Sequence, residues 1–512
     1  MQRLDHPNDI ANWLRQRVKG GLLCDSRQLQ AGDGFVAWPG AVADGRQFVR
    51  AALASGALAA VVEHSGAEVF ELDPERVLAV SGLKRQAGAI ASAFYGEPSA
   101  SLDVVAITGT NGKTSTAWWV AQLLSGLKMP CAVVGTLGIG RPPLAADAAP
   151  ALVPTGLTTP DPVLLQSRLR ALLNEGVQAC AIEASSIGLV EDRLNATQIR
   201  VAVFTNFTQD HLDFHGDMDA YWQAKAGLFE WPGLLAAVVN LDDPKGVELA
   251  SAVAGRGMDV WTVSLNDTVQ ARLAATGVQH TANGMRFQLV ERDASGAEVQ
   301  RFDLALPLVG RYNASNVLCA LASARALGFG LSQAVDACAV LTAVPGRMEQ
   351  VGAASVDAPL VLVDYAHTPD ALEKALQALQ PVVRERQGAL WVVVGCGGDR
   401  DASKRPVMAA VAEREAQRVV LTSDNPRSEA PDRILAQMAK GLARPAEATL
   451  EVDRAKAIVW AVQGASARDV VLIAGKGHED YQEISGVKRP FADVAHASAA
   501  LASRAAAQGA QA

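Results

Sequence analysis

The sequence lacks any long hydrophobic run, because no apolar stretch approaches the about 18–20 residues of a membrane-spanning helix. The first residues, MQRLDHPNDIANW, contain acidic residues and a proline in place of an apolar segment, so we expect no signal peptide. Positive charge is not in excess, since 46 Lys and Arg face 54 Asp and Glu and give a net charge of −8. A broad positive surface for nucleic acid or anionic membranes is therefore not expected.

Cysteine is scarce, and the six cysteines are too scattered to form a CxxC pair. We therefore expect reduced thiols in a cytoplasmic protein. Glycine (44 residues) and proline (23 residues) are close to average usage, which excludes a collagen-like chain and argues against extensive disorder. At about 150 residues per domain, a chain of 512 residues predicts three domains or two large ones.

The chain divides into three regions of α/β character, which we place at 1–98, 99–344 and 345–512. Short apolar runs between polar loops predict a small α/β domain in the first region: GFVAW (34–38) and LAAVVE (58–63). In the second region, apolar runs separated by helical patterns predict a central P-loop-type parallel sheet: 104–108, 131–135, 179–183, 201–205 and 236–240. Alternating residues in 268–309 predict an antiparallel insertion. Four apolar runs predict a doubly wound, Rossmann-like C-terminal domain: 360–365, 390–395, 418–424 and 469–475.

The segment TGTNGKT (108–114) directly follows the predicted strand at 104–108. Apolar residues at helical spacing come next: Ala117, Val120, Ala121 and Leu124. A glycine loop between a strand and a helix binds phosphate through backbone N–H groups, with Lys113 on the β/γ-phosphates and Thr114 on Mg²⁺. Position 107 is Ile where the full P-loop motif has glycine, so a chance glycine-rich turn is the alternative.

Three further side chains suggest a magnesium site. Glu183 ends one predicted strand, and His211 lies in the loop after the next, so both are expected at the sheet edge that carries the glycine loop. A carboxylate and an imidazole beside a triphosphate can hold Mg²⁺. A polar loop without an ion explains His211 and its neighbours equally well. Lys225, predicted on a helix, would by itself be read as a solvated charge.

An ordered set of motifs resembles the Mur ligase family over essentially the whole chain. The motifs are DSR (25–27), TGTNGKT, TTPD (158–161), EASS (183–186), TNFTQDHLDFHG (205–216), AK (224–225), GRYNASN (310–316), PGRME (345–349), DYAHTPD (364–370), GCGGDRD (395–401), DNPR (424–427) and GKGHED (475–480). The resemblance implies an ATP-dependent amide ligase of cytoplasmic peptidoglycan synthesis. It also implies that the three regions bind, in order, the UDP-linked substrate, ATP and the incoming amino acid.

The resemblance assigns roles residue by residue. For ATP it implies Gly109, Thr110, Asn111, Gly112, Lys113, Thr114, Ser115, Asn316, Arg347 and Asp364. For the UDP-muramoyl-dipeptide it implies Ser26, Val42, Ala43, Thr158, Thr159, Ser185, Glu191 and Arg193. For catalysis and Mg²⁺ it implies Lys113, Thr114, Glu183, His211 and Lys225, the last as a carbamate that supplies oxygen ligands.

The motif DNPR resembles the version that selects meso-2,6-diaminopimelate. The Arg427 guanidinium would bind the distal carboxylate of this amino acid bidentately and repel the ammonium of lysine. The resemblance adds further contacts: Arg400, Asp424, Asn425, Pro426, Gly475 and Glu479. Without the surrounding motifs, Arg427 would be read as a surface arginine in a turn. The implied reaction joins diaminopimelate to the D-Glu γ-carboxylate of UDP-MurNAc-L-Ala-D-Glu through an acyl phosphate.

Two departures and several alternatives accompany this hypothesis. Many relatives have His at position 187 and Gln at position 191, where this chain has Ile187 and Glu191. Glu191 would repel an acidic peptide unless a cation compensates it. The alternatives are an L-lysine-adding or folylpolyglutamate-synthase-like ligase, or, in another class, a P-loop kinase or nucleotide-gated binding module. We expect a monomer that binds small molecules, without nucleic acid or membrane insertion.

Overall fold

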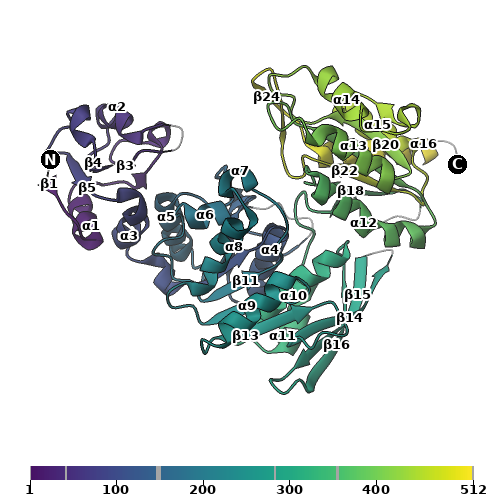
Figure 1. Cartoon of the computed structure of the whole chain (residues 1–512), viewed down its shortest axis with the longest axis horizontal. Helices are drawn as coiled ribbons and strands as arrows, with labels where there is room; N and C mark the ends of the chain where they lie inside the picture. Colours follow the sequence, from purple (N-terminus) through teal and green to yellow (C-terminus); the bar gives the residue numbers. More distant parts are fainter. Residues whose placement is uncertain (1, 41–42, 146–150, 282–283, 353–356, 510–512) are drawn as a thin grey trace. The chain divides into compact units, whose positions relative to one another are not determined.

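The computed structural model describes residues 2–40, 43–145, 151–281, 284–352 and 357–509 (Figure 1). The chain forms two compact units. The first comprises Met1–Ala274, Glu291–Gln300 and Asn316–Val340, and the second comprises Ala275–Val290, Arg301–Ser315 and Leu341–Ala512. Within the described ranges, no helix has the length and apolar character needed to cross a membrane. The predicted α/β class is confirmed, whereas the boundaries at 98/99 and 344/345 stay predictions.

The N-terminal part of the first unit is built on a five-stranded parallel sheet. Its order is β1 (Gln2–Arg3), β5 (Val77–Val80), β4 (Ala59–Glu63), β3 (Gly34–Ala37) and β2 (Leu22–Leu23). Val36 and Val61 pack with α1 (Pro7–Arg15) and α3 (Leu83–Phe94), whereas Phe35 and Val62 pack with α2 (Val49–Ala54). The strands predicted at 34–38 and 58–63 are confirmed. The other three strands, β1, β2 and β5, are two to four residues long and were not predicted.

A second sheet of the first unit places the glycine loop at its centre. Six parallel strands have the order β13 (Asp259–Ser264), β12 (Ala236–Asn240), β11 (Val201–Phe204), β6 (Asp103–Thr108), β10 (Ala179–Glu183) and β7 (Cys131–Gly135). The antiparallel strands β8 (Gly138–Arg141) and β9 (Ala151–Val153) follow β7. All five strands predicted here are confirmed. The sequence analysis missed β13.

The sheet continues beyond β13 into β14 (Leu273–Thr281), β15 (Gly284–Arg292) and β16 (Glu298–Leu306), in that order. Strand β14 pairs in parallel with β13. The neighbouring strands β14, β15 and β16 are joined by connections too short for a parallel crossover, so they run antiparallel to one another, and the antiparallel insertion predicted at 268–309 is confirmed for these three strands. The remaining helices up to residue 340 are α4 (Lys113–Gly126), α5 (Pro162–Asn174), α6 (Ser186–Val190), α7 (Leu212–His215), α8 (Met218–Ala226), α9 (Pro244–Ala254), α10 (Arg311–Ala326) and α11 (Leu331–Ala337).

Helix α4 differs from the one-sided stripe that its sequence predicts. Every residue from Thr114 to Leu124 is buried. The helix packs on β6, β7 and β10 and also contacts α11, so it has protein on several sides. The polar Gln122 is accommodated because it donates a hydrogen bond to the Pro143 carbonyl.

The second unit contains the predicted doubly wound sheet. Its order is β17 (Glu349–Gln350), β18 (Leu360–Asp364), β22 (Val470–Ala474), β19 (Leu390–Cys396), β20 (Arg418–Ser423) and β21 (Thr449–Leu450). Leu362 and Val392 face α12 (Pro369–Arg386), α13 (Lys404–Glu415) and α14 (Pro431–Ala439). Val363 and Val393 face α15 (Arg454–Gly464) and α16 (Asp493–Gly509).

The four predicted strands of the second unit are confirmed, and they are parallel. Their carboxyl ends therefore lie at one edge of the sheet, where such folds bind ligands. The motifs DYAHTPD, GCGGDRD, DNPR and GKGHED begin at or within two residues of these ends. A hairpin of β23 (Tyr481–Ile484) and β24 (Val487–Pro490) follows the last motif.

Candidate active site

The loop between β6 and α4 requires glycine at two positions. Gly109 has φ +144° and Gly112 has φ +84°. A Cβ atom on Gly109 would lie 2.0 Å from Thr205 Oγ1, and one on Gly112 would lie 2.4 Å from Asn316 Oδ1. The predicted strand, loop and helix are thus present, and neighbouring side chains approach the loop closely.

The loop folds around its own lysine. Lys113 Nζ donates hydrogen bonds to the carbonyls of Gly109 at 3.0 Å and Thr110 at 2.8 Å. Asn206 fixes the loop from outside, since its carbonyl accepts from Thr110 N–H at 2.8 Å and its Oδ1 accepts from Asn111 N–H at 2.9 Å. The first-turn amides of α4, which have no acceptor within the helix, remain as the anion-binding element.

Glu183 connects the glycine loop to the end of β7. This side chain is 1% exposed, and its Oε2 accepts a hydrogen bond from Thr114 Oγ1 at 3.0 Å. Thr136 donates to the same carboxylate through its N–H at 2.8 Å and its hydroxyl at 3.2 Å. The Thr136 hydroxyl also lies 3.1 Å from Thr158 Oγ1. The sequence analysis missed Thr136, although it too follows a parallel strand.

Lys225 is not the solvated lysine that its helix alone suggests. It lies on α8, is 1% exposed and donates from Nζ to the Gly109 carbonyl at 2.7 Å. Its ammonium lies 4.4 Å from the centroid of the Tyr221 ring. Burial, together with nearby Lys113, lowers the pKa of Lys225 well below its ordinary value of 10.5. Burial therefore penalises the charged form of Lys225 more than it would for a solvated lysine.

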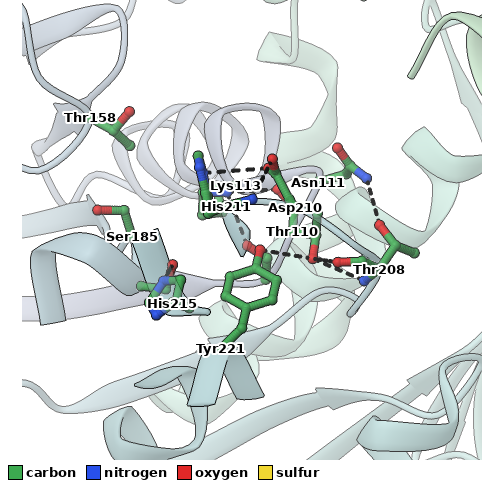
Figure 2. A network of polar contacts seen from close by, with 12 residues as sticks. Thr110, Asn111, Lys113, Thr158, Ser185, Thr208, Asp210, His211, His215 and Tyr221 are labelled. Atoms are coloured by element: carbon green, nitrogen blue, oxygen red, sulfur yellow. Dashed lines mark hydrogen bonds and ion pairs between the residues drawn. The ribbon is translucent and has the colours of Figure 1, made fainter. Parts of the chain in front are cut away.

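His211 lies immediately before α7 in a left-handed conformation, with φ +51°. Its Nε2 lies 3.4 Å from Asp210 Oδ2, and both side chains are about 40% exposed. Figure 2 shows His211 and Asp210 beside Lys113, with Thr110 and Tyr221 joined by a hydrogen bond of 3.1 Å. The sequence analysis did not single out Tyr221, whose helical position gave no signal.

The structure brings together several residues that we predicted for the muramoyl-peptide. The Thr159 hydroxyl donates to the Glu183 carbonyl at 2.7 Å and lies 2.9 Å from Ser185 Oγ. Arg193 donates to the Thr159 carbonyl at 3.0 Å. These side chains therefore meet at the backbone carbonyl of Glu183, whereas Thr158 reaches the Glu183 carboxylate through the Thr136 hydroxyl.

Glu191, the departure from the family pattern, is compensated by a cation. Its Oε2 lies 2.6 Å from Nζ of Lys84, at the start of α3. Ser26 begins a short 3₁₀ helix, and Ala43 is exposed. Val42, which we predicted with them, lies outside the described residues.

In the second unit, the predicted amino-acid residues converge at the carboxyl edge of the sheet. Arg427 donates from Nη1 to the Gly398 carbonyl at 2.8 Å and from its backbone N–H to the Glu483 carbonyl at 2.9 Å. Asn425 Nδ2 donates to Glu479 Oε2 at 2.8 Å. Asp424 and Arg400 also lie close to glycines at this edge. A Cβ added to Gly475 would lie 2.7 Å from Asp424 Oδ2, and a Cβ added to Gly397 would lie 3.8 Å from Arg400 Cγ.

Two buried arginines brace these loops. Arg405, 1% exposed, pairs with Glu429 at 2.7 Å and donates to the Gly397 carbonyl at 3.1 Å. Arg454 pairs with fully buried Asp493 at 2.7 Å and donates to the carbonyls that end β20 and β22. Both arginines thus hold the ends of the strands from which the motifs emerge.

Arg347 and Asp364 also belong to the second unit. Asp364 accepts from Met348 N–H at 2.8 Å and from Ala366 N–H at 2.9 Å, and burial raises the pKa of its carboxyl group. The Arg347 guanidinium lies 4.6 Å above the Tyr365 ring. Their role as ATP contacts stays a prediction.

Cation binding was tested against the side chains that are present. No group of three or more His, Cys, Asp and Glu side chains arranged to hold a metal ion occurs in the described part of the chain. The predicted Mg²⁺ ligands are Thr114, Glu183, His211 and Lys225, of which only Glu183 and His211 are of these residue types, so the predicted site is not such a cluster. The Thr114 hydroxyl and Glu183 carboxylate oxygens are 3.0 Å apart and are of the type that Mg²⁺ prefers. Thr114 and Glu183 therefore fit the ion, whereas the roles of His211 and Lys225 as ligands stay predictions.

The six cysteines are free, as predicted. Cys24 is half-buried, and the other five are buried.

Comparisons with known proteins cover nearly the whole chain. Three family models match in order: "Mur ligase family, catalytic domain" at residues 20–95, "Mur ligase middle domain" at 107–324 and "Mur ligase, glutamate ligase domain" at 346–477. The UDP-N-acetylmuramoyl-L-alanyl-D-glutamate–2,6-diaminopimelate ligase of Acidovorax sp. (strain JS42) is 54% identical over 503 residues, 97% of each chain. The Pseudomonas aeruginosa ligase of the same name is 45% identical over 94% of each chain.

Solved structures agree. A structure described by that same ligase name is 36% identical, with a TM-score of 0.65 over 95% of each chain. A MurF ligase from Thermotoga maritima in complex with ADP is 18% identical, with a TM-score of 0.63 over 95% of this chain and 98% of the other, and it shares the fold. On the full-length identity and the three matching models, the chain belongs to the Mur ligase family.

Proposed function

We propose that the protein is an ATP-dependent ligase that joins meso-2,6-diaminopimelate to the D-Glu γ-carboxylate of UDP-MurNAc-L-Ala-D-Glu. The observation that carries this proposal is the 54% identity over 97% of the chain to a ligase named for 2,6-diaminopimelate. The Arg427 loop supports the choice of amino acid, because a guanidinium favours a carboxylate over an ammonium. The proposal includes a monomer in the cytoplasm.

The reaction needs an activated carboxylate. The D-Glu γ-carboxylate attacks the γ-phosphorus of ATP, the bond to the β–γ bridging oxygen breaks, and an acyl phosphate and ADP result. The diaminopimelate amine then attacks the acyl carbon, loses a proton and displaces inorganic phosphate. No protein nucleophile is required.

The chain contributes binding and charge neutralisation to these steps. The first-turn amides of α4 and the Lys113 ammonium receive the phosphate oxygens, which reduces repulsion of the incoming carboxylate. Thr158, Thr159, Ser185 and Arg193 hold the acceptor beside Glu183. In the second unit, Arg427 and Glu479 receive the carboxylate and ammonium at the distal end of diaminopimelate.

Thr114, Glu183, His211 and Lys225 are the residues that would hold Mg²⁺. The ion, when bound, supplies further neutralisation of phosphate charge. Lys225 can take part only as a carbamate, because an ammonium offers no oxygen ligand. Its burial supports this modification, since an uncharged amine can add to CO₂, forming an N–C bond and releasing a proton.

The test is phosphate release from ATP with UDP-MurNAc-L-Ala-D-Glu present, comparing meso-diaminopimelate with L-lysine. Strong release with diaminopimelate and little with lysine is expected. Release with lysine would keep the ligase and reject the assigned amino acid. Release independent of both would favour a kinase or a nucleotide-gated module. A separate ¹³C NMR spectrum in labelled bicarbonate should contain a carbamate resonance that the Lys225→Met variant lacks.

A further inference from the structure

Lys476, in the motif GKGHED, is a fully buried lysine without a role in the reaction described above. Its Nζ donates hydrogen bonds to Asn425 Oδ1 at 3.1 Å and to Glu479 Oε2 at 2.9 Å. Lysine is almost never fully buried unless it is paired. Both partners are predicted contacts of the incoming amino acid, so the ammonium holds two side chains that are expected to bind substrate.

The three side chains close a ring of hydrogen bonds. Asn425 Nδ2 donates to Glu479 Oε2 at 2.8 Å, the same oxygen that accepts from Lys476. Asn425 Oδ1 accepts a second hydrogen bond, from Glu483 N–H at 2.9 Å. The orientation of the Asn425 amide is therefore determined, because its oxygen faces two donors and its nitrogen faces a carboxylate.

The ring also reaches the segment that carries Arg427. Glu483 N–H bonds to Asn425, and the Glu483 carbonyl accepts from Arg427 N–H at 2.9 Å. The Arg427 carbonyl in turn accepts from Ser485 N–H at 2.6 Å, so the backbone of Arg427 forms a parallel bridge with Ile484, the last residue of β23. The loops after β20 and β22 and the start of the hairpin are thereby tied together around one ammonium.

We propose that Lys476 is a positioning residue that sets the selectivity of the pocket for the distal amino group of diaminopimelate. By occupying Glu479 Oε2, it fixes the carboxylate so that Oε1 faces the substrate ammonium. Among the described residues, Asn425 and Lys476 both contact the Glu479 carboxylate through Oε2. Because a carboxylate held by two donors loses little freedom on binding, the contact is pre-organised. This inference rests on the proposed function.

The test uses Lys476→Met, which keeps an unbranched side chain and removes the charge and the donors. The assay is phosphate release with meso-diaminopimelate and with 2-aminopimelate, which retains the distal carboxylate but lacks the distal amino group. We expect the KM for diaminopimelate to rise at least tenfold while kcat changes less than threefold. The preference for diaminopimelate over 2-aminopimelate, as a ratio of kcat/KM values, should fall at least tenfold, with the KM for ATP within twofold.

Matched variants separate positioning from a general structural effect. Lys476 Nζ and Lys488 Nζ lie 5.4 Å and 4.2 Å from the centroid of the Tyr481 ring. Lys488→Met removes the second of these lysines, from the exposed strand β24, and should leave the preference unchanged. In a Glu479→Gln background, where the preference is already reduced, Lys476→Met should change it less than threefold further. If Lys476→Met does not fold by circular dichroism, Lys476→Gln is assayed and judged by the same ratio.

The outcomes differ for the inference and for the function on which it rests. An unchanged or increased preference in a folded variant, or an equal rise of all three substrate KM values, would overturn the role of Lys476. Wild-type protein without diaminopimelate-dependent phosphate release would instead overturn the proposed function.

Discussion

Glu191 Oε2 lies 2.6 Å from Lys84 Nζ, so the carboxylate at this position is paired with a cation from α3. The two side chains are 32% and 41% exposed, so the pair stabilises the fold by at most about 1 kcal/mol. The pair matters mainly because it changes the local charge. Lys84 neutralises Glu191 beside Arg193, which is predicted to contact an acidic peptide.

Removal of the cation should therefore weaken acceptor binding. In Lys84→Met, uncompensated Glu191 repels the substrate carboxylates, and we expect the KM for UDP-MurNAc-L-Ala-D-Glu to rise about threefold to tenfold. Glu191→Gln alone, and the double variant, should remain close to wild type. The measurement is steady-state phosphate release at low salt. Equal effects of Lys84→Met and the double variant would show that Glu191 does not act on the substrate.

Lys113→Ala should abolish ligation. The lysine supplies the charge at the phosphate site, and its loss leaves the acyl-phosphate step without compensation, which we expect to cost at least about 10³-fold in kcat. Product formation by chromatography is the measurement. Lys128→Ala, a substitution just beyond α4, is the control. Near-normal turnover of a folded Lys113→Ala variant would reject the assigned phosphate site.

Strand periodicity and strand-end motifs made much of this fold predictable. Continuous apolar runs of strand length, such as 390–395, favour a buried strand because they are too short for a typical helix, whereas the two-residue strands β1 and β2 carry no periodic signal. The first unit's site was predictable where polar residues end strands, as at Glu183. The environments of Lys225 and Lys84 could not be predicted from the sequence. Only tertiary packing decides whether a lysine on a helix is 1% exposed, as Lys225 is, or is paired with a residue distant in the sequence, as Lys84 is with Glu191.

Gly112→Ala should weaken ATP binding specifically. Alanine would have to adopt φ +84°, and its Cβ would lie 2.4 Å from Asn316 Oδ1, so both the loop and Asn316, a predicted ATP contact, must shift. We expect the Kd for ATP to rise at least tenfold by calorimetry. Gly176→Ala is a matched control, because Gly176 has φ +79° with no atom within 4 Å. It should show the conformational cost of about 1 kcal/mol without a change in ATP affinity.

Lys225 should make the stability of the first unit depend on pH. Its pKa is lower in the folded chain than its ordinary 10.5, so the unfolded chain binds more protons between these two values. Stability therefore falls as pH decreases from about 10.5 toward the folded pKa, and rises in the opposite direction. In CO₂-free buffer, we expect Tm to increase from pH 7 to pH 9.5 more for wild type than for Lys225→Met. Parallel changes in both proteins would contradict a depressed pKa at Lys225.

Arg427 should decide between diaminopimelate and lysine. Its guanidinium donates to the Gly398 carbonyl through Nη1, and its Nε lies 3.8 Å from Glu483 Oε2. A substrate carboxylate would therefore bind the Nε and Nη2 edge of the planar fork in competition with Glu483. Arg427→Lys keeps the charge but cannot bind bidentately, so we expect kcat/KM for diaminopimelate to fall about 10- to 100-fold. Arg427→Ala should lose at least as much, and its discrimination against L-lysine should narrow, because the repelling cation is gone.

Arg418→Ala, at the opposite end of β20, controls for loss of surface charge on the same strand and should retain wild-type selectivity. Phosphate release with each amino acid gives the ratio of kcat/KM values for the four proteins. An unchanged ratio in folded Arg427→Ala would mean that the distal carboxylate is bound elsewhere. Because Asn425 and Glu479 remain in place in this variant, such a result would direct attention to the side of the pocket that binds the amino group.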